Sequence, residues 1–186
     1  MKAMPLLLTL ATLTLSPLAL QAPALANEAV LKQVEKAAGQ KIEVGSTVNF
    51  TTTKGKFSVV LFPKEAPETV KNFEKLVKAK FYDGLSFHRV IPGFVAQGGD
   101  PKGDGTGGPG WSIPDELKSK LKHLDGSLSM AKSAAPNSAG SQFYFCLGAQ
   151  PHLDTRYTVF GQVVSGMDVV NKLTVGDKML KVQLAE

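Results

Sequence analysis

The stretch that decides the fold is 87-FHRVIPGFVAQGGD-100. It places a cation, an aromatic ring and an amide close together, at Arg89, Phe94 and Gln97, with no acid or nucleophile among the three. Alternate residues of a strand project to the same face, and Pro92-Gly93 can bend the chain between the two halves of the stretch. One surface can therefore present all three side chains, and we interpret them as the centre of a site.

Two further blocks support this interpretation. They are 129-SMA-131 with 136-PNSAGSQFYF-145, and 153-LD-154 with 157-YTVFG-161. All three blocks, in this order, resemble the cyclophilin family of peptidyl-prolyl cis-trans isomerases. The resemblance extends from about Thr47 to the C-terminus and includes a bacterial-type run at 105–116, so we expect a member of the bacterial exported branch.

The segments around these blocks predict a mainly β domain. Residues 48–61 alternate apolar and polar side chains on either side of Lys54-Gly55, which is a hairpin pattern. Apolar residues at helical spacing after Pro67 predict an amphipathic helix, and residues 166–173 predict a second, short one. Further strand-like runs lie at 126–130, 142–147, 157–164 and 179–184. The resemblance implies a closed eight-stranded antiparallel barrel capped by two α-helices, with any substrate groove on its outside.

The chemistry open to such a site is rotation about an X-Pro bond. The peptide C–N bond resists rotation with a barrier of about 18–20 kcal/mol, although the two X-Pro isomers differ by only about 0.5–1 kcal/mol. As the imide twists, its nitrogen regains a lone pair, and a donor aimed there stabilises the twisted state selectively. The rigid guanidinium fork suits that task. We assign it to Arg89, as the resemblance also implies, with no metal or organic cofactor.

The resemblance implies a groove around this arginine. Phe94 is expected to wall the proline pocket and, with Gln97, to complete the catalytic set. The other expected substrate-binding residues are His88, Val95, Ala131, Lys132, Gln142, Tyr144, His152, Leu153 and Tyr157. The amides of Gln97 and Gln142 could hold the substrate carbonyl oxygen and the adjacent backbone.

Strand parity separates core from groove in the run 142–145. Gln142 and Tyr144 share one face of the strand, and Phe143 and Phe145 share the other. We therefore expect the two phenylalanines in the barrel core. Tyr144 itself departs from the familiar family pattern, which has phenylalanine there.

Other departures from that pattern also lie in the groove. Val95 replaces a longer methionine, His152 a tryptophan and Tyr157 a histidine. Catalysis should survive these changes, whereas binding of cyclosporin should be weak.

Composition excludes several other classes. The chain has 186 residues, a net charge of +5 and a single cysteine, Cys146, which we expect to be a small packing residue. The lysines are scattered among acids, which favours a solvated basic surface over a nucleic-acid site.

The glycine-rich run 98–114 predicts an irregular loop. Its G-x-G-x-x-G match lacks a crossover helix, which excludes a dinucleotide site. The three histidines lack metal-ligand spacing.

The N-terminal sequence predicts an export signal. Residues 1–26 have Lys2, a mostly apolar stretch and the small-x-small site Ala24-Leu25-Ala26, so we expect cleavage after Ala26 and no membrane insertion afterwards. The periplasm is the expected compartment, with secretion or an internal lumen as alternatives. Residues 27–46 form an expected helical extension, with its helix over Asn27–Gly39. Residues 47–186 form the isomerase domain, which we expect to be monomeric.

The expected function is isomerisation of X-Pro bonds in unfolded or flexible proline-containing polypeptides, which would assist the folding of exported proteins. Two alternatives to this function remain open from the sequence. The chain could instead be a non-catalytic chaperone or binding module for proline-containing segments. It could also be an inhibitor-type or assembly subunit that works through the helix at residues 27–39.

Overall fold

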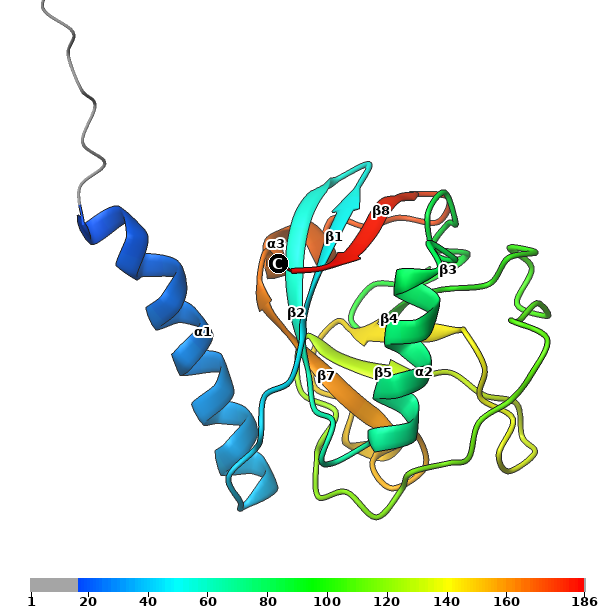
Figure 1. The fold of residues 1–186 in the computed structure, drawn as a ribbon, viewed down its shortest axis with the longest axis horizontal. Helices are drawn as coiled ribbons and strands as arrows, with labels where there is room; N and C mark the ends of the chain where they lie inside the picture. Colours follow the sequence, from blue (N-terminus) through cyan, green and yellow to red (C-terminus); the bar gives the residue numbers. More distant parts are fainter. Residues whose placement is uncertain (1–16, 186) are drawn as a thin grey trace, which may run out of the picture.

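The structure is a computed structural model that describes the backbone of residues 17–185 and the side chains from residue 27 onward. The predicted signal peptide therefore lies largely outside the described residues. The elements, in order, are α1 (Pro17–Ala38), β1 (Thr47–Thr52), β2 (Gly55–Leu61), α2 (Pro67–Lys78), β3 (Arg89–Ile91), β4 (Val95–Gly98), β5 (Ser127–Met130), β6 (Phe143–Cys146), the 3-10 turn η1 (Pro151–Leu153), β7 (Val159–Ser165), α3 (Met167–Val170) and β8 (Met179–Leu184) (Figure 1).

The eight strands form one antiparallel sheet that curls into a half-barrel (Figure 1). Their order is β3-β4-β6-β5-β7-β2-β1-β8, so β3 and β8 are the two edges. The expectation of a closed barrel is therefore wrong, although the eight strands and the antiparallel pairing are confirmed.

The barrel stays open because the chain is irregular where the two edges approach. The segment 84–87, before β3, meets the start of β8 through single backbone bonds rather than a ladder. Gly84 N donates to Met179 O at 2.7 Å, and Met179 N donates to Leu85 O at 2.8 Å. Gly84 has φ +83°, a conformation that L residues rarely adopt and that turns the chain away from regular strand geometry.

Aromatic rings fill the concave side of the sheet, as strand parity predicts. Phe50 stacks on Phe57 with ring centroids 4.7 Å apart, and Phe145 meets Phe57 edge-on at 5.2 Å. The apolar face of α2 covers one end, where Phe73 contacts Phe143 at 5.5 Å. The short helix α3 packs beside β2, so both expected helices of the domain are present.

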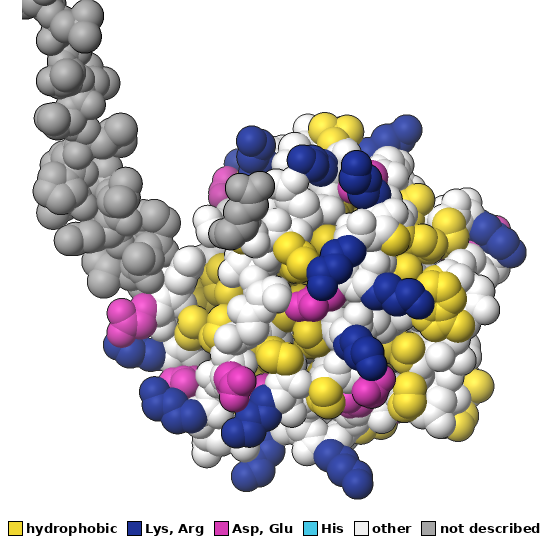
Figure 2. Space-filling view, viewed as in Figure 1, with side chains coloured by type: hydrophobic (Ala, Val, Ile, Leu, Met, Phe, Trp, Pro, Cys, Tyr) yellow, Lys and Arg dark blue, Asp and Glu magenta, His cyan; other side chains and the backbone are white. Residues whose placement is uncertain are grey.

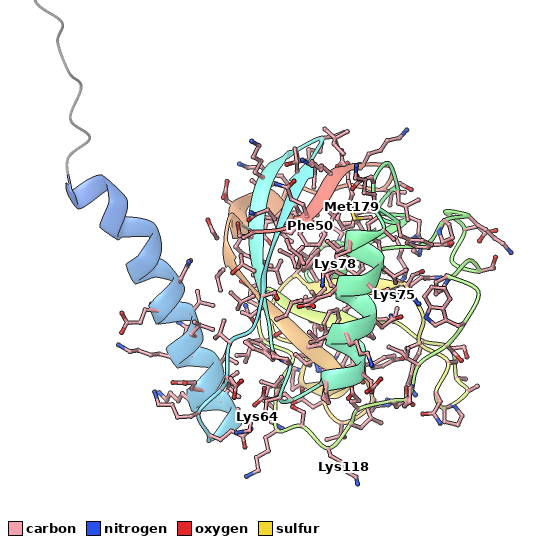
Figure 3. All side chains as sticks on the ribbon, in the orientation of Figure 1. Phe50, Lys64, Lys75, Lys78, Lys118 and Met179 are labelled. Carbon is pink, nitrogen blue, oxygen red and sulfur yellow. The ribbon has the colours of Figure 1, made fainter. Side chains whose placement is uncertain are left out.

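The polar face of α2 points to solvent. Lys75 and Lys78 on this helix are exposed, whereas Phe50 and Met179, labelled near its upper end in Figure 3, are fully buried. On the face drawn in Figure 2, lysines are dispersed and acids lie between several of them. This face therefore shows no single basic patch, in agreement with the interpretation of a solvated surface.

The N-terminal helix is longer than predicted and belongs to the domain surface. It begins at Pro17 and runs through Asn27, so Asn27 lies within the helix rather than at its expected start. Val34 and Ala38 pack against β7 and β2 in a second apolar cluster that includes Phe62 and Val164. This apolar side already faces the domain, so a partner could use only the outer side. No helix among the described residues is long and apolar enough to cross a membrane.

Two adjacent alanines test whether this packing stabilises the protein. Ala38 is 6% exposed, whereas Ala37 is exposed. We expect Ala38→Asp to lower the free energy of unfolding by about 1–3 kcal/mol, because it places a polar group in the apolar contact. Ala37→Asp is the matched control and should have little effect. Urea denaturation of both variants checks this, and equal losses would show that α1 does not depend on its contact with the sheet.

Candidate active site

The site is built on the hairpin of β3 and β4. Arg89 lies directly opposite Gln97 in the antiparallel ladder, so their side chains share a face. Phe94 closes the turn between the strands, where its N–H donates to Ile91 O at 3.0 Å. Gly93 has φ +72°, which explains a glycine at the bend. The predicted trio therefore does converge.

A pocket of about 170 Å³ with both apolar and polar walls opens beside the hairpin. It is lined by Arg89, Phe94, Val95, Gln97, Ala131, Lys132, Tyr144, Leu153 and Tyr157. Every lining residue belongs to the set predicted from the sequence. Cys146 packs behind this wall, and burial raises the pKa of its thiol to about 12, so it is a packing residue rather than a thiolate nucleophile.

The guanidinium at the pocket rim is not neutralised. Arg89 is exposed, and no carboxylate of the described residues forms an ion pair with it. Its Nη1 donates to Gln97 Oε1 at 3.4 Å, and its Cζ lies 5.4 Å from the centre of the Phe94 ring. These contacts orient the fork but leave most of its donors available to a ligand.

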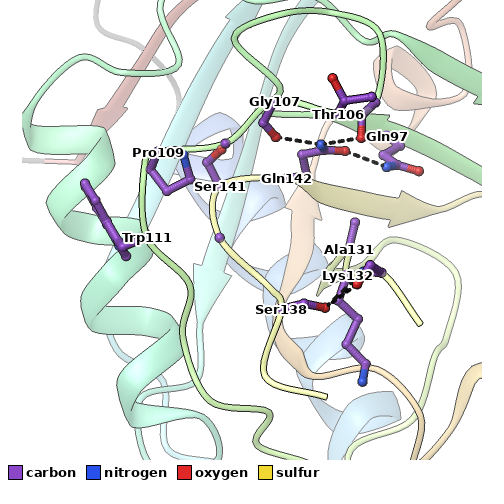
Figure 4. A pocket seen from close by; sticks show the side chains of 14 residues that line it. Gln97, Thr106, Gly107, Pro109, Trp111, Ala131, Lys132, Ser138, Ser141 and Gln142 are labelled. Carbon is purple, nitrogen blue, oxygen red and sulfur yellow. Dashed lines mark hydrogen bonds between the residues drawn. The ribbon is translucent and has the colours of Figure 1, made fainter. Parts of the chain in front are cut away.

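A chain of side-chain amides continues from this arginine. Gln97 Nε2 donates to Gln142 Oε1 at 3.0 Å. Gln142 Nε2 then donates to the carbonyl oxygens of Gly105 and Gly107, at 2.9 and 2.8 Å (Figure 4). Both amide hydrogens of Gln142 are thus used within the protein. We therefore interpret Gln142 as a positioning residue, whereas the sequence suggested an amide free to hold substrate.

The glycine loop, at the far end of this series of hydrogen bonds, is held by Asp100, which is only 1% exposed. Its carboxylate accepts the backbone N–H groups of Lys102, Asp104 and Gly105, at 2.8, 3.1 and 2.6 Å. Burial works to raise the pKa of Asp100, but backbone N–H donors, chiefly those of Lys102 and Gly105, outweigh it and hold the pKa below its usual value. A Cβ at Gly107 would collide with this carboxylate. Asp100 therefore fixes the glycine loop on which Gln142 depends.

We expect Asp100→Asn to loosen this loop. One carboxylate oxygen becomes an NH₂ group that faces N–H donors, which should lower the free energy of unfolding by about 1–3 kcal/mol. The rate of isomerisation should fall as well, because Gln142 loses its fixed acceptors. The control is Asp104→Asn, an exposed carboxylate that bonds Thr106. Chemical denaturation and kcat/KM of both variants provide the measurement, and a loss shared equally by the two would contradict the assignment.

A second hollow of about 430 Å³ adjoins the first. The two share Gln97, Ala131 and Lys132, and the glycine loop and residues 138–142 form the far walls (Figure 4). Lys132 is anchored at this junction by Asp115, with Nζ 2.7 Å from Oδ2. Sequence reasoning missed this hollow, since loop backbone forms much of it; the only signal was the glycine-rich run itself.

Two predicted site histidines lie outside both hollows. His88 projects toward the glycine loop, where a Cβ at Gly105 would lie 4.0 Å from its Nε2. Neither of its ring nitrogens hydrogen-bonds to another described residue. His152 stacks on Phe94 at the rim, with ring centroids 5.7 Å apart. Among the described residues no group of His, Cys, Asp and Glu could hold a metal ion.

Acidification should destabilise the fold. Burial lowers the pKa of His88 and of His123 below 6.5, and for His123 it prevails over the opposing effect of Asp154. The unfolded chain therefore binds these protons first, and the free energy of unfolding falls as the pH drops below about 6.5. Urea denaturation at several pH values measures this fall. His88→Gln should reduce the slope, and a wild-type stability that is flat or rises toward low pH would contradict the assignment.

Comparison with known proteins gives a consistent result. Residues 47–184 match the family model described as cyclophilin type peptidyl-prolyl cis-trans isomerase/CLD. A peptidyl-prolyl cis-trans isomerase of Synechococcus elongatus is 51% identical over 135 residues, covering 72% of this chain and 92% of the relative. Peptidyl-prolyl cis-trans isomerase B of Bacillus subtilis is 50% identical over 130 residues, covering 69% and 90%. A crystal structure of a Cryptosporidium parvum cyclophilin type isomerase, in the presence of the dipeptide Ala-Pro, matches with a TM-score of 0.70 and 30% identity, covering 75% of this chain and 99% of that one.

Proposed function

The chain belongs to the cyclophilin-type peptidyl-prolyl cis-trans isomerase family, and we propose that its pocket accelerates X-Pro rotation in flexible segments of exported proteins. One observation carries this proposal: the Arg89 guanidinium, which forms no ion pair with any described residue, stands at the rim of a pocket walled by Phe94, Val95 and Leu153. The pocket can hold the proline ring while the charged fork meets the imide nitrogen. The solved relative crystallised in the presence of Ala-Pro supports a proline-containing ligand.

Each pocket residue has a distinct task in this mechanism. Phe94, Val95 and Leu153 exclude water from around the proline ring. Gln97 accepts a hydrogen bond from Arg89 and so sets the direction of the fork. As the imide twists, a guanidinium N–H donates to the nitrogen lone pair, an interaction stronger in the twisted state than in either planar isomer. No proton transfer or covalent bond is needed.

The direct test is exchange of a proline-containing peptide followed by NMR. The wild type should increase the cis/trans exchange rate at catalytic concentrations of protein. Binding of the same peptide without faster exchange would favour the non-catalytic binding module. The absence of both would overturn the assignment of the pocket.

We also propose that the protein is exported to the periplasm, cleaved after Ala26 and monomeric. Among the side chains that the structure describes, Val30, Val34 and Ala38 of α1 belong to an apolar cluster with the domain, and a chain cleaved after Ala26 would keep these contacts. Mass spectrometry of the protein from fractionated cells tests this, together with light scattering for the oligomeric state. A mature chain that retains Lys2 would contradict the export proposal.

A further inference from the structure

His123 joins two walls of the proline pocket from behind. It is 1% exposed and lies between Asp154 and Tyr144. Its Nδ1 is 2.9 Å from Asp154 Oδ1, and its Nε2 is 3.1 Å from the Tyr144 hydroxyl. Tyr144 lines the pocket from β6, and Asp154 directly follows Leu153, which lines it from η1. No local pattern indicates this link, because Tyr144 and Asp154 lie 21 and 31 positions from His123 along the chain.

The direction of each hydrogen bond follows from the charge on Asp154. Burial works to raise the pKa of this carboxyl, but two N–H donors of His123 and nearby Lys122 outweigh it and keep the group ionised. A carboxylate only accepts, so Nδ1 must carry the imidazole hydrogen. Since burial lowers the pKa of His123, the ring is neutral and its Nε2 has a free lone pair. The Tyr144 hydroxyl therefore donates to Nε2.

These two hydrogen bonds restrain the ring of Tyr144 in the wall of the proline pocket. The His123 and Tyr144 rings lie nearly parallel, with an interplanar angle of 13° and centroids 6.1 Å apart. On its other side Tyr144 meets Tyr157, also a pocket residue, edge-on at 6.1 Å. The hydroxyl is the group that separates Tyr144 from the phenylalanine of the familiar family pattern. In this chain the hydroxyl gains His123 Nε2 as a hydrogen-bond partner.

We propose that His123 is a positioning residue that ties Tyr144 to the Asp154 turn and so sets the shape of the proline pocket. This inference rests on the proposed function of that pocket. His123 does not touch substrate, because it is buried and both its ring nitrogens are occupied. Its effect should therefore appear mainly in how tightly the proline segment binds, and so in KM more than in kcat.

Two amide replacements of His123 separate its two links. The amide of His123→Asn can take the place of Nδ1 and donate to Asp154, but it is too short to reach Tyr144. The longer amide of His123→Gln can reach the place of Nε2 and accept from Tyr144. We expect His123→Asn to raise KM about three- to tenfold, the range expected for one lost hydrogen bond. His123→Gln should restore most of that loss, although both variants lose stability.

Tyr144→Phe completes a double-mutant cycle. Alone, it should raise KM by a factor similar to that of His123→Asn. The double variant should be no worse than either single variant, because both remove the same interaction. Losses that multiply, or equal KM values for His123→Asn and His123→Gln, would overturn the inference. If His123→Asn does not fold, Tyr144→Phe alone tests the inference. A KM of Tyr144→Phe equal to that of the wild type would then count against it.

The wild type separates this inference from the proposed function. If it accelerates exchange and the variants do not follow the pattern above, only the positioning role of His123 fails. If it binds the peptide without turnover, the catalytic proposal fails, and the dissociation constant of that peptide replaces KM in every comparison. Circular dichroism at near-ultraviolet wavelengths confirms that each variant is folded.

Discussion

Replacing Arg89 by alanine is expected to lower kcat/KM by about 100- to 1000-fold, the usual loss on removing a donor that stabilises a transition state. The free energy of unfolding should barely change, because the side chain is exposed and forms no ion pair among the described residues. The loss should fall mainly on kcat, since the donor acts on the twisted imide more than on bound substrate. NMR exchange rates of a proline peptide at several concentrations separate the two constants.

Two further variants test whether the loss of activity is due to the guanidinium of Arg89. Arg89→Lys keeps the charge but not the planar fork, so it should recover only part of the activity. Arg156 is the chain's other arginine, is exposed and lies outside the pocket lining, so Arg156→Ala should behave as wild type. Full activity in a folded Arg89→Ala protein would show that the guanidinium is not the catalytic donor.

Replacing Phe145 by alanine is expected to lower the free energy of unfolding by about 3–5 kcal/mol. The ring is fully buried and meets Phe50, Phe57 and Phe143 at centroid distances of 5.6, 5.2 and 5.6 Å. Removing it leaves a cavity that neighbouring rings cannot easily fill, because close-packed interiors relax only in part. Since domains are stable by only about 5–15 kcal/mol, this loss threatens folding itself.

The control is Phe145→Leu, which keeps an apolar side chain at this site and should cost clearly less. Guanidinium denaturation of the three proteins, at one temperature and pH, gives the comparison. A cost below about 1 kcal/mol for Phe145→Ala, typical of less critical positions, would mean that strand parity had been assigned to the wrong face.

Local regularity explains what the sequence predicts well. Period-two alternation in β6 correctly places Phe143 and Phe145 inside and Tyr144 on the groove. The hairpin around Pro92-Gly93 likewise brings Arg89 opposite Gln97. In these segments one short-range rule, the alternation of side chains along a strand, decides which face each residue occupies.

Long-range contacts explain what the sequence does not predict. The barrel remains open because of an irregular approach between the segment before β3 and the start of β8, which no periodicity encodes. The amide hydrogens of Gln142 are taken by carbonyls of a glycine-rich loop more than 30 residues away in sequence. The extra length of α1 also escapes prediction, because nothing in the run before Asn27 separates a helix from an export signal.

The placement of α1 has a practical consequence for handling this protein. In Figure 1, α1 lies on the opposite side of the view from the glycine loop that borders the groove. A biotin or fluorophore attached near Asn27 would therefore leave the groove unobstructed. Immobilised on a sensor chip through that end, the enzyme should still capture peptides from the flowing solution.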